Sequence, residues 1–139
     1  MSHAHSDALA RLREQMEGPP FHHLLRPQAV DVDPEGGTIT IRLQFRDELA
    51  RAKSDRAFHG GVIASLIDLA GHAAVAVKIG RMAPTIDLRI DYMSRAEGEA
   101  ITAHAKLLKA GRSVARVDIE VFDAQNRSVA LGRGTYSTI

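Results

Sequence analysis

The chain has 139 residues, of which 45% are hydrophobic and 25% are charged, and its formal net charge is +1 at pH 7. A chain of this length builds one core rather than two, and a nearly balanced charge gives no general attraction to nucleic acid or acidic membranes. Cysteine is absent, which excludes disulfides and thiolate chemistry. No basic segment followed by an apolar run opens the chain, so no secretory signal is expected. We therefore predict one cytoplasmic domain over residues 1–139.

The first predicted element is a short N-terminal helix over about residues 7–17, where apolar residues recur at helical spacing. The run Gly18-Pro19-Pro20 ends that pattern. Phe21, Leu24 and Leu25 follow, and we expect them to anchor an irregular connection in the core.

Five or six stretches alternate apolar and polar residues with a period of two, which is typical of half-buried strands. Turn signals such as Asp33-Pro34-Glu35-Gly36-Gly37 separate them. Closely spaced turns favour an antiparallel sheet with one apolar face, and we expect the later strands to form a meander. The predicted strands cover residues 28–32, 38–45, 85–93, 101–107, 113–122 and 128–138.

The stretch from Phe58 to Val77 predicts one helix that is apolar on nearly all sides. A helix without a polar face must be buried all round. Its clearly polar side chains, Ser65, Asp68 and His72, are spaced three and four residues apart, so they share one stripe. A carboxylate on a buried helix is costly unless it is used in chemistry or paired, here with His72 or with an arginine such as Arg89. Asp68 is therefore the first candidate for a functional residue.

One apolar sheet face and one apolar helix have a simple arrangement, in which the sheet curls around the helix. The predicted fold class is therefore α+β, with one long buried helix wrapped by a curved antiparallel sheet of five to six strands. The helix should end near Gly80, because glycine and basic residues are favoured at a helix C-terminus. A sheet covers only one side of a helix, so we expect a second copy of the chain to cover the other side in a homodimer.

Several motifs carry a family resemblance. The most specific is His59-Gly60-Gly61 followed by Asp68, nine residues after the histidine. With Pro84 to Tyr92, the turn Lys109-Ala110-Gly111-Arg112 and the closing Ala130-Leu131-Gly132, the chain resembles a hotdog-fold thioesterase. The resemblance is to the branch that includes the phenylacetate-degradation type of acyl-CoA thioesterase, and it runs from about residue 21 to 136. It implies a hotdog fold for the predicted domain.

The resemblance also implies an activity, namely hydrolysis of an acyl- or aryl-CoA thioester without a cofactor. Family members use the helix carboxylate as general base or nucleophile, and Asp68 matches it. They hold the thioester carbonyl with a backbone amide of the glycine pair, which Gly60 matches. A hydroxyl residue on the strand after the helix often orients the water, and Thr85 stands there. The family site lies between two subunits, and dimers can pair into tetramers.

The other candidate residues between His59 and His72 have both a structural and a functional interpretation. His59 either takes part in the chemistry or caps the loop and sets its shape. Gly61 and Ser65 lie on the stripe of Asp68 and are candidates for substrate binding, although a serine inside a helix commonly bonds to its own backbone. His72 is more typical of a satisfied core or interface histidine than of a base.

Cations are candidates for binding the phosphates of coenzyme A, a role that suits arginine geometry. Arg81, Lys109 and Arg112 stand near the ends of predicted elements, although solvated strand ends are commonly basic without any ligand. Metal binding is not expected, because the histidine pairs at 3/5 and 22/23 lack further ligands at suitable spacing and are better explained as surface residues.

One position departs from the family pattern. Many members of the branch carry an asparagine about six residues before the histidine, and Lys53 stands there in this chain. The departure keeps an alternative function open, a non-catalytic hotdog module that binds acyl-CoA or an acyl carrier without cleaving it. A hotdog dehydratase or hydratase is a third interpretation, less favoured because those members use a catalytic histidine in a different motif.

Overall fold

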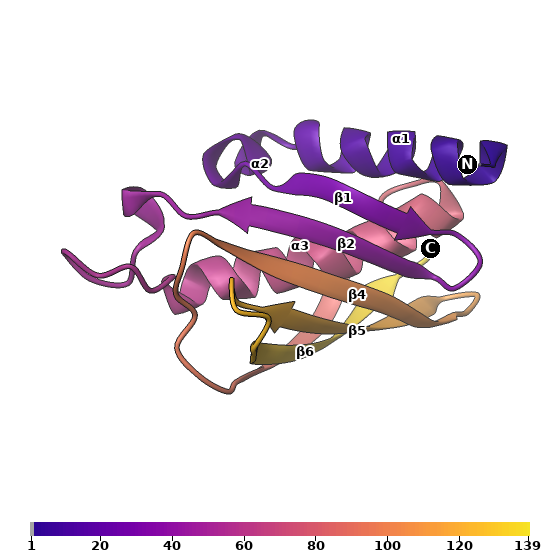
Figure 1. Cartoon of the computed structure of the whole chain (residues 1–139). Helices are drawn as coiled ribbons and strands as arrows, with labels where there is room; N and C mark the ends of the chain where they lie inside the picture. The colour runs from indigo at the N-terminus through magenta and orange to yellow at the C-terminus, as the bar shows by residue number, and fades with distance from the viewer. Residues whose placement is uncertain (1) are drawn as a thin grey trace.

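A computed structural model describes residues 2–139, which form three α-helices, one 3-10 turn and six strands (Figure 1). The elements in chain order are α1 (His3–Glu17), α2 (Pro20–Leu25), β1 (Gln28–Asp33), β2 (Thr38–Gln44), the 3-10 turn η1 (Asp47–Leu49), α3 (Gly60–Ile79), β3 (Thr85–Tyr92), β4 (Ala100–Ala110), β5 (Val114–Phe122) and β6 (Ser128–Ser137). The predicted helices and strands are all present, with boundaries shifted by a few residues.

Helix α1 begins at His3, four residues before the predicted start, which was therefore wrong. Ser2 is the N-cap, and its hydroxyl accepts a hydrogen bond from the His5 amide at 3.1 Å. The first turn contributes no buried residue, since the buried positions of α1 are Ala8, Leu12 and Met16. The first turn contacts the fold through His5, whose Nε2 lies 3.0 Å from Oδ1 of Asp31, and apolar periodicity could not reveal a turn held by a polar contact.

The connection after α1 is the short helix α2 rather than an irregular segment. Leu25 is buried as expected, but Phe21 and Leu24 are 53% and 68% exposed, so the prediction that they anchor the core was wrong. His22 was predicted at the surface and is instead buried, with its Nδ1 3.1 Å from the carbonyl oxygen of Met16. That contact joins α2 to the last turn of α1.

The six strands form one antiparallel sheet in the order β1-β2-β4-β5-β6-β3. Strands β4, β5 and β6 are the predicted meander, but β3 pairs with β6 at the far edge and not with β4. The chain therefore crosses the end of the sheet between residues 93 and 99. Alternation within a strand indicates which of its faces is buried, but it does not indicate which strand lies beside it. The pairing of β3 with β6 could therefore not be predicted from the sequence.

The sheet wraps around α3, which lies against its inner face (Figure 1). Eleven residues of α3 are buried, and the helix ends at Ile79 with Gly80 as a left-handed C-cap of φ 77°, as predicted. By length and composition α3 is also able to cross a membrane, yet 61% of its apolar window is buried inside the fold. The prediction of a core helix wrapped by a curved sheet, a hotdog fold, is confirmed.

Strand β3 is the least covered strand of the sheet. Leu88 and Ile90 are half-buried, whereas Ile86 and Tyr92, which were expected to share their inward face, are 58% and 54% exposed. A register shift follows Thr85 where β3 pairs with β6, which breaks the simple alternation there. One edge of the sheet thus exposes both apolar side chains and unpaired backbone groups.

Candidate active site

The polar stripe of α3 lies on the side of the helix that the sheet leaves open. Gly61 is exposed, and Ser65, Asp68 and His72 are half-buried, whereas eleven other residues of the helix are buried. The expectation that α3 is buried all round is therefore not met within a single chain. The open stripe is where the candidate site begins.

Asp68 is held by two hydroxyl groups from the sheet. Thr85, the first residue of β3, donates its Oγ1 hydrogen to Oδ1 of Asp68 at 2.7 Å. Tyr136 of β6 donates its phenol to the main-chain oxygen of Asp68 at 3.2 Å; burial, and then the charge of Asp68, hold the pKa of Tyr136 well above its usual value. Arg89, named in the sequence as a possible ion-pair partner of Asp68, contacts Asp91 instead. The carboxylate of Asp68 is thus oriented by a neutral donor, the hydroxyl of Thr85.

The N-terminus of α3 presents one free amide. His59 is the N-cap: its Nδ1 accepts from the Gly61 amide at 2.8 Å, and its carbonyl accepts from the amides of Val62 and Ile63. The capping interpretation of His59 is confirmed. Within residues 2–139 the Gly60 amide donates to no acceptor, so this N–H is available to a ligand at the positive end of the helix dipole.

The other two polar residues of the stripe are already satisfied. The Ser65 hydroxyl donates to the Gly61 carbonyl at 2.9 Å, which confirms that it bonds back to its own helix. Nε2 of His72 accepts from the Ala83 amide at 3.1 Å, so the imidazole carries its proton on Nδ1. The Ser65 hydroxyl hydrogen and the Nε2 lone pair of His72 are thus both already used in hydrogen bonds within the chain.

Tyr92, at the end of β3, was not singled out from the sequence as a site residue. Its hydroxyl donates to the Gly60 carbonyl at 2.7 Å, and its ring lies where a side chain on residue 60 would make contact, since a Cβ there would be 3.5 Å from Cε1. Strand β3 therefore touches both parts of the candidate site, Asp68 through Thr85 and Gly60 through Tyr92. Alternation alone gives no sign of this contact, because it depends on where β3 lies in the sheet.

The two parts of the site are too far apart to act on one bond within a chain. Gly60 and Asp68 are eight residues apart on one helix, which separates them by about 12 Å along the axis at 1.5 Å per residue. A carbonyl group bound to the Gly60 amide needs its attacking group within about 3.5 Å. Within one chain, the Gly60 amide and the Asp68 carboxylate therefore do not reach the same carbonyl group.

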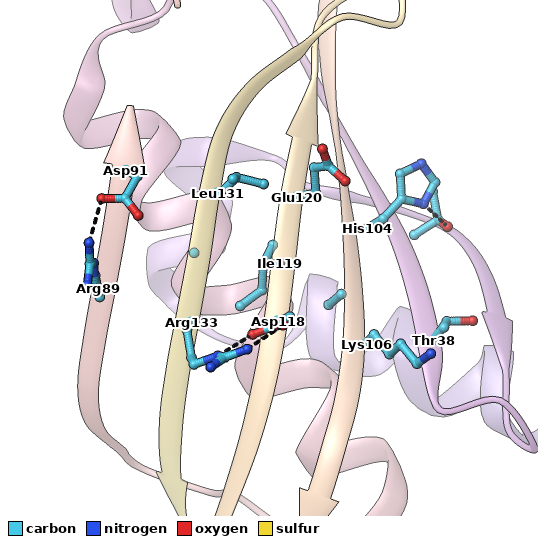
Figure 2. Close-up of a pocket in the computed structure, with 13 residues that line it drawn as sticks. Thr38, Arg89, Asp91, His104, Lys106, Asp118, Ile119, Glu120, Leu131 and Arg133 are labelled. Carbon is cyan, nitrogen blue, oxygen red and sulfur yellow. Dashed lines mark hydrogen bonds and ion pairs between the residues drawn. The ribbon is translucent and has the colours of Figure 1, made fainter. Parts of the chain in front are cut away.

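A depression of the surface lies elsewhere, on the outer face of the sheet (Figure 2). It encloses about 590 Å³ and none of Gly60, Asp68 or Thr85 lines it. Its charged side chains largely pair with one another, as Arg133 does with Asp118 at 2.6 Å; that hydrogen bond holds the pKa of Asp118 below its usual value. We find no reacting group there, and no group of three metal-ligating side chains exists among the residues described.

Comparison with known proteins identifies the family. A sequence model of the thioesterase superfamily matches residues 57–130, which include the whole of α3, Asp68 and Thr85. The chain belongs to the thioesterase superfamily. It is a thioester hydrolase by that membership, and the resemblance noted in the sequence is confirmed.

Relatives of this thioesterase span most of its length. A Halobacterium salinarum protein provisionally named an esterase is 30% identical over 94% of this chain and 91% of its own. The medium/long-chain acyl-CoA thioesterase YigI of Escherichia coli K12 is 35% identical over 56% of this chain and 60% of its own. Among solved structures, a protein of the thioesterase superfamily has a TM-score of 0.88 at 30% identity, covering 95% of this chain and 98% of that one. The PaaI protein of the E. coli phenylacetic acid degradation operon has a TM-score of 0.84 at 23% identity, covering 98% and 96%, and shares the fold.

The cations predicted to bind phosphate gather at the C-terminal end of α3. Arg81 donates to the Thr138 carbonyl, and Thr138 also bonds to Ser113 and Gly111 of the β4–β5 turn. Lys109 and Arg112 flank that turn and are exposed. The fold thus brings Arg81 and this hairpin to one side of the thioesterase.

The loop that departs from the family pattern is held by ion pairs. Lys53 is exposed, and the neighbouring Asp55 pairs with Arg51 at 2.7 Å and Arg95 at 3.0 Å. The hydrogen bond from Arg51 lowers the pKa of Asp55 to about 2. The loop therefore has a defined shape without an asparagine at the position of Lys53.

Proposed function

We propose that this thioesterase hydrolyses the thioester of an acyl- or aryl-CoA to a free acid and coenzyme A. One observation carries the proposal: the Gly60 amide at the start of α3 lacks an acceptor among the residues that the structure describes, while Thr85 orients the carboxylate of Asp68 on the same open stripe. The relative YigI, named for acyl-CoA substrates, supports the substrate class.

The geometry supports a mechanism in two steps. The thioester carbonyl oxygen accepts from the Gly60 amide, whose position at the helix terminus stabilises the negative charge that develops on that oxygen. Asp68 acts as general base on a water, or as nucleophile, at the carbonyl carbon. In the general-base route Asp68 takes a proton from the attacking water, the C–S bond breaks, and that proton passes to the coenzyme A sulfur, which restores the carboxylate. In the nucleophile route the C–S bond breaks as Asp68 forms a mixed anhydride, and a water then hydrolyses the anhydride to the free acid and the Asp68 carboxylate, with one proton of the water passing to the thiolate.

We infer that the working unit is a homodimer with shared sites. Strand β3 is an edge strand with exposed Ile86 and Tyr92, so two copies can pair along it. A two-fold axis through the middle of β3, between Leu88 and Arg89, brings Thr85 of one chain near Tyr92 of the partner subunit. Asp68 of one chain then lies near Gly60 of the partner subunit, which removes the separation found within one chain. A tetramer of two such dimers and a cytoplasmic location stay predictions.

The test is hydrolysis of a panel of thioesters from acetyl- to palmitoyl-CoA, with phenylacetyl- and hydroxybenzoyl-CoA, followed with a thiol reagent. Because the chain has no cysteine, the protein itself does not react in this assay. We expect turnover of at least one class, and loss of turnover in Asp68→Asn with an unchanged circular dichroism spectrum. A folded wild-type protein that cleaves none of them, yet binds a non-hydrolysable acyl-CoA in calorimetry, would support the binding module that the Lys53 departure left open.

A further inference from the structure

The segment between α3 and β3 contacts α3 at two points that are one helical turn apart. Ala83 donates its amide hydrogen to Nε2 of His72 at 3.1 Å, and Thr85 donates its hydroxyl hydrogen to Oδ1 of Asp68 at 2.7 Å. Asp68 and His72 are four residues apart and therefore lie on one face of the helix. Together the two contacts close a ring that contains α3, Ala83, Pro84 and Thr85.

His72 is suited to remain an acceptor at neutral pH. A backbone amide can only donate, so Nε2 must be unprotonated in this contact. Burial lowers the pKa of His72 below its ordinary value, with the charge of Asp68 acting against the shift and His22 of α2 adding to it. The ring of Tyr136 in β6 packs nearby, with the ring centroids 6.4 Å apart.

The anchored segment is held by the burial of the Ala83 side chain, which belongs to the core, and by few polar contacts on the side of α3. It follows the left-handed Gly80 and lies outside the regular elements up to Thr85. Pro84 has no N–H to donate, and its carbonyl accepts from Ser137 of β6, on the side of the sheet. The Ala83 amide is thus the main-chain group that ties this segment to the catalytic helix.

We propose that His72 is a positioning residue, which holds Ala83 against α3 and thereby places the Thr85 hydroxyl on Asp68. The inference rests on the proposed function, because it presupposes that Asp68 and Thr85 act on the substrate. His72 touches neither the substrate nor the reacting atoms and works through the position of Thr85.

Replacing His72 by glutamine or by asparagine tests whether its role depends on the hydrogen-bond acceptor at Nε2 or on another property of the imidazole. His72→Gln places an amide oxygen at about the reach of Nε2, whereas His72→Asn is one methylene shorter and leaves the Ala83 amide without a partner. Both variants are polar, neutral and untitratable, so each is the control for the other. Each is made alone and in combination with Thr85→Val, and the Ala83 amide is followed by hydrogen exchange in NMR spectra.

We expect His72→Asn to lower kcat about tenfold with little change in KM, because small displacements of a catalytic group cost rate rather than binding. His72→Gln should keep kcat within about threefold of the wild type, as one retained hydrogen bond predicts. In the Thr85→Val background, His72→Asn should cause no further loss. Exchange of the Ala83 amide should be fast in His72→Asn and slow in His72→Gln.

Three results would overturn the role of His72. These are wild-type kcat in His72→Asn, an equal loss in both amide variants, or the same loss with and without Thr85→Val. Each is distinct from failure of the proposed function, which would appear as an inactive wild type or an active Asp68→Asn. If the wild type is inactive on the whole panel, the proposal falls with the proposed function, whatever the exchange of the Ala83 amide shows.

Discussion

The hydroxyl of Thr85 lies 2.7 Å from Oδ1 of Asp68 and joins the first residue of β3 to the middle of α3. The residues are 17 positions apart in the chain, and only the return of β3 beside α3 brings them together. The bond gives the carboxylate one fixed direction on an otherwise apolar helix. Several consequences of this arrangement are open to experiment.

Replacing Thr85 should slow the reaction without unfolding the protein. Thr85→Val keeps the shape of the side chain and removes the donor, so Asp68 loses a hydrogen bond to its charged form. A bond of that kind corresponds to about ten- to hundredfold in rate if it is kept in the transition state. Thr85→Ser retains the hydroxyl and should keep most of the activity. Steady-state kinetics of the three proteins tests this, and a Thr85→Val enzyme as fast as the wild type would rule out the orienting role.

Gly60→Pro removes the free amide with little other change. Gly60 is the first helical residue, where proline is well tolerated, and its N–H has no partner to lose within the described part of the chain. A side chain there makes ordinary contact with the ring of Tyr92. We expect kcat to fall about a hundredfold or more, the usual cost of losing one oxyanion donor. Gly60→Ala keeps the N–H and is the matched control, which should lose markedly less.

Mixed dimers test whether each site uses two chains. A dimer with one Asp68→Asn chain and one Gly60→Pro chain contains, if sites are shared, one site with an intact Gly60 amide and an intact Asp68. The doubly tagged mixed dimer should then show about half the wild-type activity, although each parent dimer is inactive. An inactive mixed dimer, from parents that are folded and dimeric by light scattering, would place the whole site in one chain.

Gly71→Ala should destabilise the fold, because a Cβ at that position would lie 2.1 Å from the hydroxyl oxygen of Tyr136. Tyr136 is completely buried, so its ring has little room to move. Overpacking of this kind costs about 1–3 kcal/mol in the free energy of unfolding. Tyr136→Phe removes the closest atom, and we expect the double variant to be less destabilised than the two single changes add up to. Urea unfolding of the four proteins measures this coupling, and strict additivity would contradict it.

The free energy of unfolding should depend on pH through His72. Its pKa lies below the ordinary 6.5 in the folded protein, mainly through burial, while Asp68 opposes and His22 supports the shift. Below pH 6.5 the unfolded chain therefore takes up a proton that the folded chain does not, and the free energy of unfolding falls as the pH falls. Above pH 6.5 the contribution is fully present. His72→Gln cannot titrate, so its free energy of unfolding should decline less steeply below pH 6.5 in urea titrations, and parallel curves would contradict the assignment.

Much of the candidate site was predictable from the local pattern. Asp68 was singled out because a lone carboxylate on an apolar helix is costly, and that argument needs no neighbours. Capping by His59 was one of two interpretations left open, and the bond of Ser65 to its own helix was expected as the common outcome; both contacts lie within four residues along the chain. The site contacts that depend on β3 differ, since the bond of Tyr92 to Gly60 spans 32 positions.

The sequence by itself determined most of the elements, the apolar helix with its single polar stripe, and the turns between strands, because periodicity and capping are properties of neighbouring residues. Only the tertiary structure decided that β3 lies at the edge beside β6, that Phe21 and Leu24 are exposed while His22 is buried, and that the Gly60 amide is free. These outcomes depend on which segments compete for the same surface and for the same hydrogen-bond donors. The competing segments are distant in sequence, so the residue pattern of any one segment does not predict which of them makes the contact.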